Sequence, residues 1–467
     1  MPTLPGSLEA PPGPLETQPA TQEPLLAPVP QQFNWLQREA PSNALLEALL
    51  SVQSPGGLTL STSLTEEASD NFAHSRTDTR SAARTGVTLG TIYRLNDERL
   101  FVSLLNSVRA FYETPTDRSQ IGYANLSLNA GYQLAPFSFG LSDRFTRDDS
   151  GQSSSLTVPD TTAPLLRPGQ TFLRNSVSPQ VRYEISPRVT TALRYTNTVV
   201  IDESDSTGDY ISHTVSPTVA YQLSRNLAGS TSYSFTRSDS AGAGASIGSS
   251  HRLTTNLGYR YDIDARTSAS VTTFATGVDR SSSSGGQNSL TYGGSIGVRR
   301  LLFSTVSILG SIGPSVVQRQ GESARVRAVW NVSLDGPIPI FATPTLTLTL
   351  VTRQNVQDTV GEVNDVGLVL RQIADARLTY TPAASFNAAL FATYTRNELL
   401  EGANASGATR GRIDNFWSTG LRASYALTRI ISLTGIYRYQ RRDSNNSIND
   451  YDENRLTVAL TGAFPIF

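Results

Sequence analysis

Few kinds of side chain in this 467-residue chain could carry chemistry. There is no cysteine, and no lysine is found anywhere along the sequence, so all 38 basic residues are arginine. The chain therefore has no thiol nucleophile or thiolate metal site, and it cannot build a P-loop or a Schiff base. The three histidines, His74, His213 and His251, lack the spacing of metal ligands. We accordingly expect no enzyme, no metal and no other cofactor.

After these exclusions, arginine is the residue type whose side chain could bind a ligand. Its guanidinium group stays charged and offers a planar pair of donors, which suits carboxylates and phosphates. The chain as a whole is not basic, because 39 acidic residues bring the net charge to -1. This balance leaves no overall basic footprint and argues against a nucleic-acid partner. What the arginines do must therefore depend on the elements that position them.

Residues 1–57 differ in composition from the rest and hold 11 of the 25 prolines. Proline donates no backbone hydrogen bond, so this segment is predicted to be a disordered, proline-rich periplasmic arm. A short helix is expected at 42–51, where Ser42 is a suitable N-cap before a leucine-rich run. That helix could pack on the main body, or it could serve as a docking helix or plug.

From residue 58 to the end, short runs alternate apolar and polar residues with the period-two spacing of a β-strand. Leu346, Leu348 and Leu350, for example, alternate with threonines. The predicted strands are 58–67, 81–93, 99–112, 120–133, 137–147, 173–185, 188–200, 210–222, 226–237, 250–262, 266–278, 288–299, 304–318, 323–335, 344–356, 365–380, 385–397, 413–426, 430–442 and 453–464.

Three features favour a transmembrane barrel over soluble β-sandwiches, which also alternate. Most predicted strands are long enough to cross a bilayer at a tilt, short turns alternate with mostly long polar loops, and tyrosine and phenylalanine recur near strand ends. Lipid cannot satisfy free backbone groups, so such a sheet must close on itself. We predict an all-β, antiparallel up-and-down barrel over 58–467, with about 20 strands (range 16–22) and both ends on the periplasmic side.

The apolar face of such a barrel meets outer-membrane lipid, and its polar face lines the lumen. Pairing with acidic residues could simply keep this lumen wet, or its arginines could form a cationic conduit for anionic solutes or acidic polysaccharide. The predicted lumen-lining residues are Arg84, Arg109, Arg144, Arg182, Arg194, Arg260, Arg325, Arg327, Arg371, Arg377, Arg422, Arg438 and Arg455, together with Arg299.

The first predicted hairpin resembles that of a β-barrel porin family of bacterial outer-membrane proteins. The resemblance rests on the run from Leu58 to Phe72 with its Asp70-Asn71 pair, on Asp78, and on the Gly86-containing second strand. Ala68 and Ser69 depart from the usual aromatic and small polar residues before that pair. Members of the family often accompany exopolysaccharide export systems.

The resemblance implies an outer-membrane channel for export of an exopolysaccharide. Two alternatives stay open at the level of sequence. One is a general diffusion porin that prefers small anionic solutes. The other is a barrel that forms a sheath around a periplasmic partner, with residues 1–57 as the contact arm.

Overall fold

The computed structural model describes residues 56–71, 79, 81–114, 118–149, 171–203, 209–240, 247–281, 287–302, 305–321, 323–338, 346–358, 368–400, 411–445 and 450–466. The predicted helix at 42–51 and the greater part of the predicted arm lie outside these residues.

Twenty β-strands make up the described part of the chain, and they form one sheet. They are β1 (Gly56–Ser69), β2 (Ala82–Asn96), β3 (Leu100–Thr114), β4 (Arg118–Leu134), β5 (Phe137–Asp149), β6 (Thr171–Ser186), β7 (Val189–Asp202), β8 (Tyr210–Gln222), β9 (Leu227–Ser240), β10 (Ile247–Asp262), β11 (Thr267–Ser281), β12 (Gln287–Leu302), β13 (Val306–Arg319), β14 (Arg325–Pro337), β15 (Leu346–Asp358), β16 (Leu368–Ala383), β17 (Phe386–Leu399), β18 (Ile413–Ala426), β19 (Ile431–Ser444) and β20 (Tyr451–Pro465).

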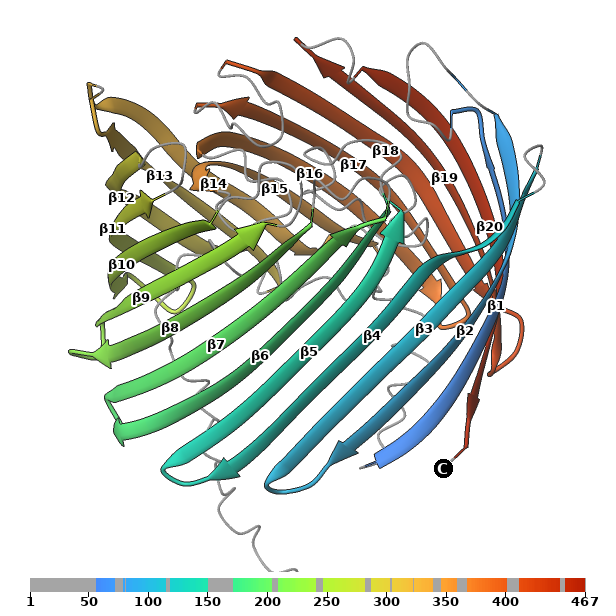
Figure 1. Ribbon diagram of the computed structural model, residues 1–467, viewed down its shortest axis with the longest axis horizontal. Coiled ribbons are helices and arrows are strands. Elements are labelled where there is room, and N and C mark those ends of the chain that lie inside the picture. The colour runs from blue at the N-terminus through green and yellow to red at the C-terminus, as the bar shows by residue number, and fades with distance from the viewer. Residues whose placement is uncertain are drawn as a thin grey trace, which may run out of the picture.

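Each strand pairs in antiparallel fashion with the strands before and after it in the chain, and the ring is closed by β1 against β20 (Figure 1). The closing ladder runs from Thr59 opposite Pro465 to Ser69 opposite Arg455. The predicted up-and-down barrel is therefore confirmed, and each predicted strand is found. Closure satisfies the backbone groups of what would otherwise be two free sheet edges.

The two ends of the barrel carry different connections. Tight turns such as 97–99, 187–188 and 263–266 lie at one end, which we call the short-turn end. Mostly longer connections, such as 150–170 and 400–412, lie at the other, which we call the long-loop end. The barrel begins at Gly56 and finishes at Pro465, both at the short-turn end (Figure 1).

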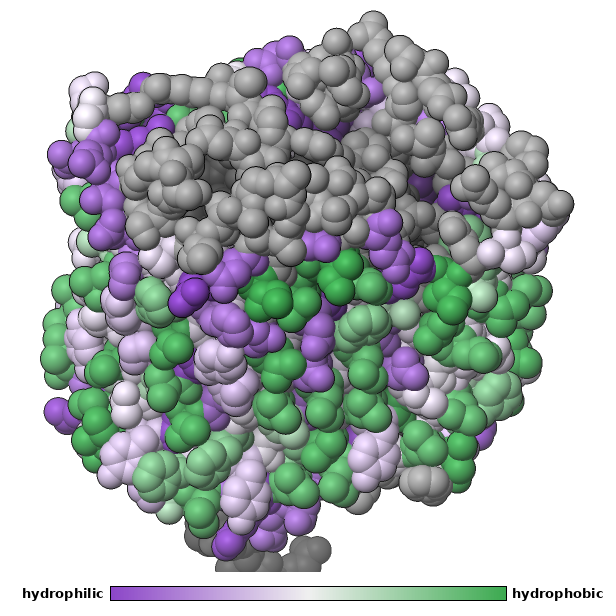
Figure 2. Space-filling model, viewed as in Figure 1, coloured by the Kyte–Doolittle hydropathy of each residue, from purple (hydrophilic) through white to green (hydrophobic). Residues whose placement is uncertain are grey.

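The period-two pattern gives the wall two chemically different faces. Large apolar side chains such as Leu89, Ile296 and Val326 lie on one face and are exposed, which identifies it as the outer face. Figure 2 shows hydrophobic side chains over much of the middle and lower visible wall, with hydrophilic ones gathered toward the upper edge. Such an exterior suits lipid rather than water. No helix among the described residues has the length and apolarity needed to cross a membrane.

The Asp70-Asn71 pair of the first hairpin joins β1 to β20 at the long-loop end. The Asp70 carboxylate accepts hydrogen bonds from the Asn454 backbone N–H and from its side-chain amide, both at 2.8 Å. The buried Asn71 amide donates to the carbonyl oxygen of Asp452 at 2.7 Å. These two residues therefore fasten the end of β1 to the start of β20.

Candidate functional site: the inner face of the barrel

The strand registers place every arginine of the predicted set on the inner face. That face is marked by buried polar side chains such as Thr65, Ser418 and Thr457, which alternate with the exposed apolar residues of the outer face. The inner-face arginines are Arg84, Arg109, Arg144, Arg182, Arg194, Arg260, Arg325, Arg327, Arg371, Arg377, Arg422, Arg438 and Arg455, and Arg299 joins them.

Burial separates these arginines into a buried group, an exposed group and a partly exposed remainder, which the sequence did not distinguish. Arg84, Arg371, Arg438 and Arg455 are buried, and they lie on β2, β16, β19 and β20. Arg182, Arg194, Arg299 and Arg325 are instead exposed to solvent, on β6, β7, β12 and β14. The remaining arginines of the set, Arg260 among them, are partly exposed, so the buried group alone is closed to a solute.

A charged cluster on the inner face joins the two ends of the chain. Glu67 of β1 pairs with Arg109 of β3 (Oε2 to Nη2, 3.1 Å) and with Arg455 of β20 (Oε1 to Nη1, 3.4 Å). Glu453 accepts from Arg455 at 2.7 Å and from the Ser69 hydroxyl. We call Glu67, Ser69, Arg109, Glu453 and Arg455 the seam cluster. The two carboxylates and the two guanidiniums of this cluster compensate each other's charge away from solvent. The cluster therefore holds β1 to β3 and β20 rather than binding a solute.

A second ion pair extends the seam cluster along β2 and β3. The Arg84 guanidinium pairs with Glu113, directly opposite it in the ladder. The same guanidinium lies over the Phe111 ring, 4.6 Å from the ring centroid. A guanidinium is attracted to the face of an aromatic ring, so this arrangement also holds Arg84 against the wall.

Asp414 forms a further charged group that the sequence reading did not single out. This fully buried carboxylate lies 2.9 Å from Arg412 Nη2 and 3.3 Å from Arg442 Nη2. Asp414 lies in the predicted strand 413–426, but it was not among the predicted lumen-lining residues. Its even position shares the period-two parity of Arg422, so the alternation of β18 could have placed it on the inner face.

The wall from β6 to β12 is polar in another way. Serine and threonine hydroxyls pair across neighbouring strands of the inner face, as cross-strand partners do in antiparallel sheets. The pairs are Ser176–Thr198 at 3.3 Å, Thr214–Thr236 at 2.9 Å, Thr254–Thr276 at 3.2 Å and Thr272–Ser295 at 2.7 Å. Small hydroxyl side chains leave room beside them, and they can exchange hydrogen bonds with a polar solute.

The accessible arginines stand among these hydroxyls. Arg194 donates to the Gln180 side-chain oxygen at 2.6 Å, and this fixes its guanidinium against the wall. Arg260 pairs with Asp262 at 2.9 Å, with both side chains about half exposed. An exposed ion pair of this kind contributes little stability and can exchange partners with a passing anion. The β6–β12 wall can therefore bind carboxylates and phosphates from solution.

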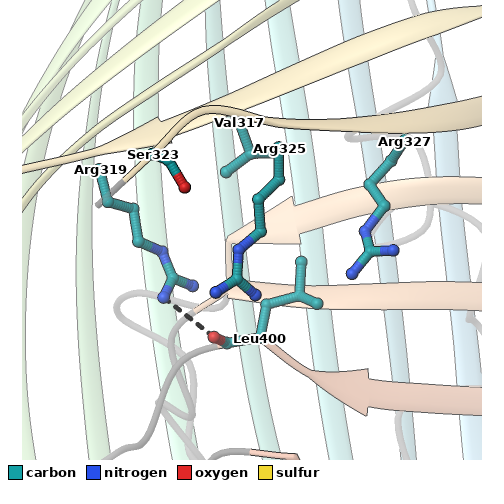
Figure 3. Close-up of a pocket in the computed structure, with 6 residues that line it drawn as sticks. All are labelled: Val317, Arg319, Ser323, Arg325, Arg327 and Leu400. Carbon is teal, nitrogen blue, oxygen red and sulfur yellow. Dashed lines mark hydrogen bonds between the residues drawn. The ribbon is translucent and has the colours of Figure 1, made fainter.

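Three more guanidiniums gather near the long-loop end of β13 and β14 (Figure 3). Arg319, Arg325 and Arg327 extend from these strands in the same direction, toward Leu400. Arg319 Nη1 donates to the Leu400 carbonyl oxygen at 2.9 Å, and Arg327 lies 3.7 Å from a Glu398 carboxylate oxygen. Arg319 was absent from the predicted set, although its two-residue spacing from Val317 continues the inner face.

The two histidines that the structure describes lie apart on the outer face of the barrel. His213 and His251 lie on the outer face, and each shares a hydrogen bond with a neighbouring tyrosine, Tyr195 at 2.8 Å and Tyr233 at 2.7 Å. Over the part of the chain that the structure describes, no group of three potential metal ligands is found. His74 lies outside the described residues.

The closed barrel, its apolar exterior and its polar interior define a β-barrel porin of the outer membrane. The family described as "Putative beta-barrel porin 2" matches residues 293–464, from within β12 to β20. This match confirms the family resemblance. It does so through the C-terminal strands, whereas the resemblance was first seen in the N-terminal hairpin. The fold is that of a transmembrane β-barrel.

Solved porin structures are similar to the chain at a low level. OpdQ of Pseudomonas aeruginosa is 11% identical, with 89% of this chain and 100% of that chain covered and a TM-score of 0.41. A BenF-like porin from Pseudomonas fluorescens Pf-5 is 10% identical, with 87% and 99% covered and a TM-score of 0.42. Similarity this low carries nothing about the transported solute. No curated protein matches the sequence.

Proposed function

We propose that the chain is an outer-membrane channel for export of an acidic exopolysaccharide. The observation that carries the proposal is the solvent-exposed set Arg182, Arg194 and Arg299 on the hydroxyl-lined β6–β12 wall. A guanidinium makes two parallel hydrogen bonds to a uronate carboxylate, and wall hydroxyls match sugar hydroxyls. The export systems that accompany the family in which the resemblance places the chain support the same substrate class.

In this proposal the short-turn end faces the periplasm. Support comes from Gly56 and Pro465, which both lie at that end, and from the longer connections at the opposite end, as outer-membrane barrels have on the outside. Residues 1–57 would then reach a periplasmic part of the export machinery. A protease added to intact cells, with an epitope placed in the 150–170 connection or at residue 2, tests this orientation.

A general diffusion porin that prefers small anions is the second candidate, because the same exposed arginines would serve it. The two differ in whether the lumen engages a polymer. A diffusion porin selects small ions by charge, whereas an export channel also holds successive acidic units of a chain. A neutral polymer of equal length separates simple obstruction from electrostatic engagement.

The test measures ion currents through the purified protein in a planar lipid bilayer. We expect an anion-selective reversal potential in a salt gradient, and block of the current by polygalacturonate but not by dextran of equal length. The triple variant R182Q/R194Q/R299Q should lose both properties. The control variant Arg441→Gln removes an outer-face arginine whose side chain is 55% exposed, and it should change neither.

Each outcome decides between the candidates. Anion selectivity without block by polygalacturonate supports the diffusion porin and overturns the export proposal. A gene deletion that leaves the amount of surface polysaccharide unchanged also overturns it. Block that persists in the triple variant would mean that the β6–β12 wall does not engage the polymer.

A further inference from the structure

Two histidines occupy matching places on the outer face of the barrel wall. His213 lies on β8 and His251 on β10, and Nδ1 of each ring is hydrogen-bonded to the hydroxyl of the tyrosine 18 positions before it. Tyr195 is the partner of His213 at 2.8 Å, and Tyr233 is the partner of His251 at 2.7 Å. The same polar pair is therefore built twice into a face that elsewhere suits lipid.

These hydrogen bonds determine which ring nitrogen can donate to a ligand. The amide nitrogen of Asn197 lies 3.2 Å from the same Nδ1 atom of His213. An amide nitrogen donates and does not accept, so Nδ1 accepts and the ring proton is on Nε2. The Tyr233 hydroxyl can donate to Nδ1 of His251 in the same way, and the Phe235 ring packs against this imidazole with centroids 4.9 Å apart. Among the described residues none is hydrogen-bonded to Nε2 of either ring, so both nitrogens remain available to a ligand.

Arg237 of β9 stands between the two histidines. It lies directly opposite His213 in the β8–β9 ladder, and it is the diagonal neighbour of His251, whose direct partner is Phe235. Directly opposed side chains of an antiparallel pair have Cβ atoms about 5 Å apart, and diagonal ones are within about 7–8 Å. The Arg237 side chain is 54% exposed. One guanidinium and two imidazoles therefore share a small area of the outer wall.

Two carboxylates border this area, and they decide how its charge depends on pH. Asp239 Oδ1 lies 3.5 Å from Arg237 Nε, and Asp279 of β11 lies exposed and directly opposite His251. The described titratable groups that face the two imidazoles are Tyr195, Tyr233, Arg237, Asp239 and Asp279. While the imidazoles are neutral, the carboxylates leave the area without an excess of positive charge. Histidine is the type of side chain that gains charge between about pH 8 and pH 5, so acidification makes the area cationic.

The same area borders the apolar part of the outer wall, near the long-loop end. Strands β8 and β10 both start at that end, and His213 and His251 lie near their starts. The next outer-face residues toward the middle of the wall are Val215 and Leu253, which are 39% and 52% exposed. Tyrosines gather where lipid headgroups meet the apolar core of a membrane. A lipid whose acyl chains lie on Val215 and Leu253 therefore has its headgroup beside the histidines.

We propose that His213, Arg237 and His251 bind the phosphate of an anionic lipid headgroup, and that acidification strengthens this binding. A guanidinium and a protonated imidazole both donate charge-assisted hydrogen bonds to phosphate oxygens. The occupant is a lipid because the three side chains lie on the face that meets the bilayer, beside exposed apolar residues. The proposal needs only a membrane barrel, and it does not depend on which solute passes through the lumen.

The test is native mass spectrometry of the full chain released from detergent micelles that contain phosphatidylglycerol or phosphatidylcholine. The phosphodiester of phosphatidylglycerol keeps its single negative charge over the pH range used, so a pH effect reports on the protein. We expect phosphatidylglycerol to be retained about tenfold more than phosphatidylcholine at about pH 5.5, and less than about twofold more at about pH 8.

Three variants and a matched control locate the effect. H213Q/H251Q should lose the gain at low pH, and Y195F/Y233F, which keeps both imidazoles but removes the hydroxyls that hold them, should reduce it. Arg237→Gln should lower the retention of phosphatidylglycerol at both pH values. Arg441→Gln is the matched control, because Arg441 pairs with Asp443 two residues on at 3.0 Å, with side chains 55% and 45% exposed. Its ladder neighbours are Trp417 and Asp452 rather than histidines, so the control should change neither value.

The folded state of each variant is checked by its migration on unheated gels, so that a misfolded variant is not scored. Equal retention of the two lipids by the native chain at low pH would overturn the proposal, as would an undiminished gain in folded H213Q/H251Q. If Arg441→Gln lowers retention as much as Arg237→Gln, any boundary arginine serves and the site is refuted. Loss of bound phosphatidylglycerol to millimolar inorganic phosphate would identify a free-anion site and overturn the lipid assignment.

Discussion

Replacing Glu67 by glutamine tests whether the seam cluster holds the barrel closed. The substitution keeps the shape of the side chain and removes its charge. Arg109 then loses the carboxylate at 3.1 Å, and its side chain is only 11% exposed, so its charge stays in a dry site without compensation. Arg455 keeps Glu453 at 2.7 Å and is affected less.

The expected loss in the free energy of unfolding is about 3–5 kcal/mol, the usual cost of removing one partner of a buried ion pair. It is measured by urea unfolding of the barrel in lipid vesicles, followed by tryptophan fluorescence. Glu66→Gln is the matched control, because the adjacent carboxylate lies on the outer face, where it is exposed and accepts from the Thr85 hydroxyl. That control should change the free energy by less than about 1 kcal/mol.

A double-mutant cycle completes the test. Arg109→Met added to Glu67→Gln removes the uncompensated charge, so the double variant should be more stable than Glu67→Gln alone. The role given to the seam cluster is refuted if Glu67→Gln lowers the free energy of unfolding no more than Glu66→Gln does. It is also refuted if the double variant is less stable than Glu67→Gln alone.

Three further expectations concern joints and turns. Asp70→Ala removes two hydrogen bonds of a carboxylate to Asn454 and should lower the free energy of unfolding by about 1.5–3 kcal/mol, seen as a lower urea midpoint. Gly313→Ala would place a Cβ 1.8 Å from the Gly294 carbonyl oxygen, so it should force β12 and β13 apart and raise amide hydrogen exchange in both strands. Asp264, in a short turn, accepts from the backbone N–H two residues on at 2.6 Å, and this bond lowers the pKa of its carboxyl. Its contribution to stability is therefore present at neutral pH and is lost as the pH falls through the lowered pKa; a carboxyl titration by NMR that shows an ordinary pKa would contradict this.

The strands could be predicted from sequence because their signal is local. Period-two alternation survives in each strand by itself, as in 210–222 and 413–426, whose bounds agree with β8 and β18. The same parity assigned the arginines to one face, since each residue's side is fixed by its neighbours along the strand. Their role in a pore remains a proposal.

Partners across the barrel could not be predicted in this way. Glu453 and Ser69 are 384 positions apart, and only closure of β1 against β20 brings them into contact. The burial of Arg84, Arg371, Arg438 and Arg455 likewise depends on what stands opposite each side chain. Local alternation carries no information on either.

The sequence by itself determined the class of fold, the number of strands and the face on which each arginine lies, because all three depend on spacing along the chain. The tertiary structure alone decided which arginines are buried beside carboxylates and which neighbouring strands share the fewest backbone pairs. Nothing in the alternation of β14 or β15 marks the short ladder between them, which has eight pairs from Trp330 opposite Gln354 to Pro337 opposite Thr347, although both strands pair regularly on their other sides. How far neighbouring strands pair depends on how the closed ring brings them together, so it is a property of the whole barrel and of no single strand.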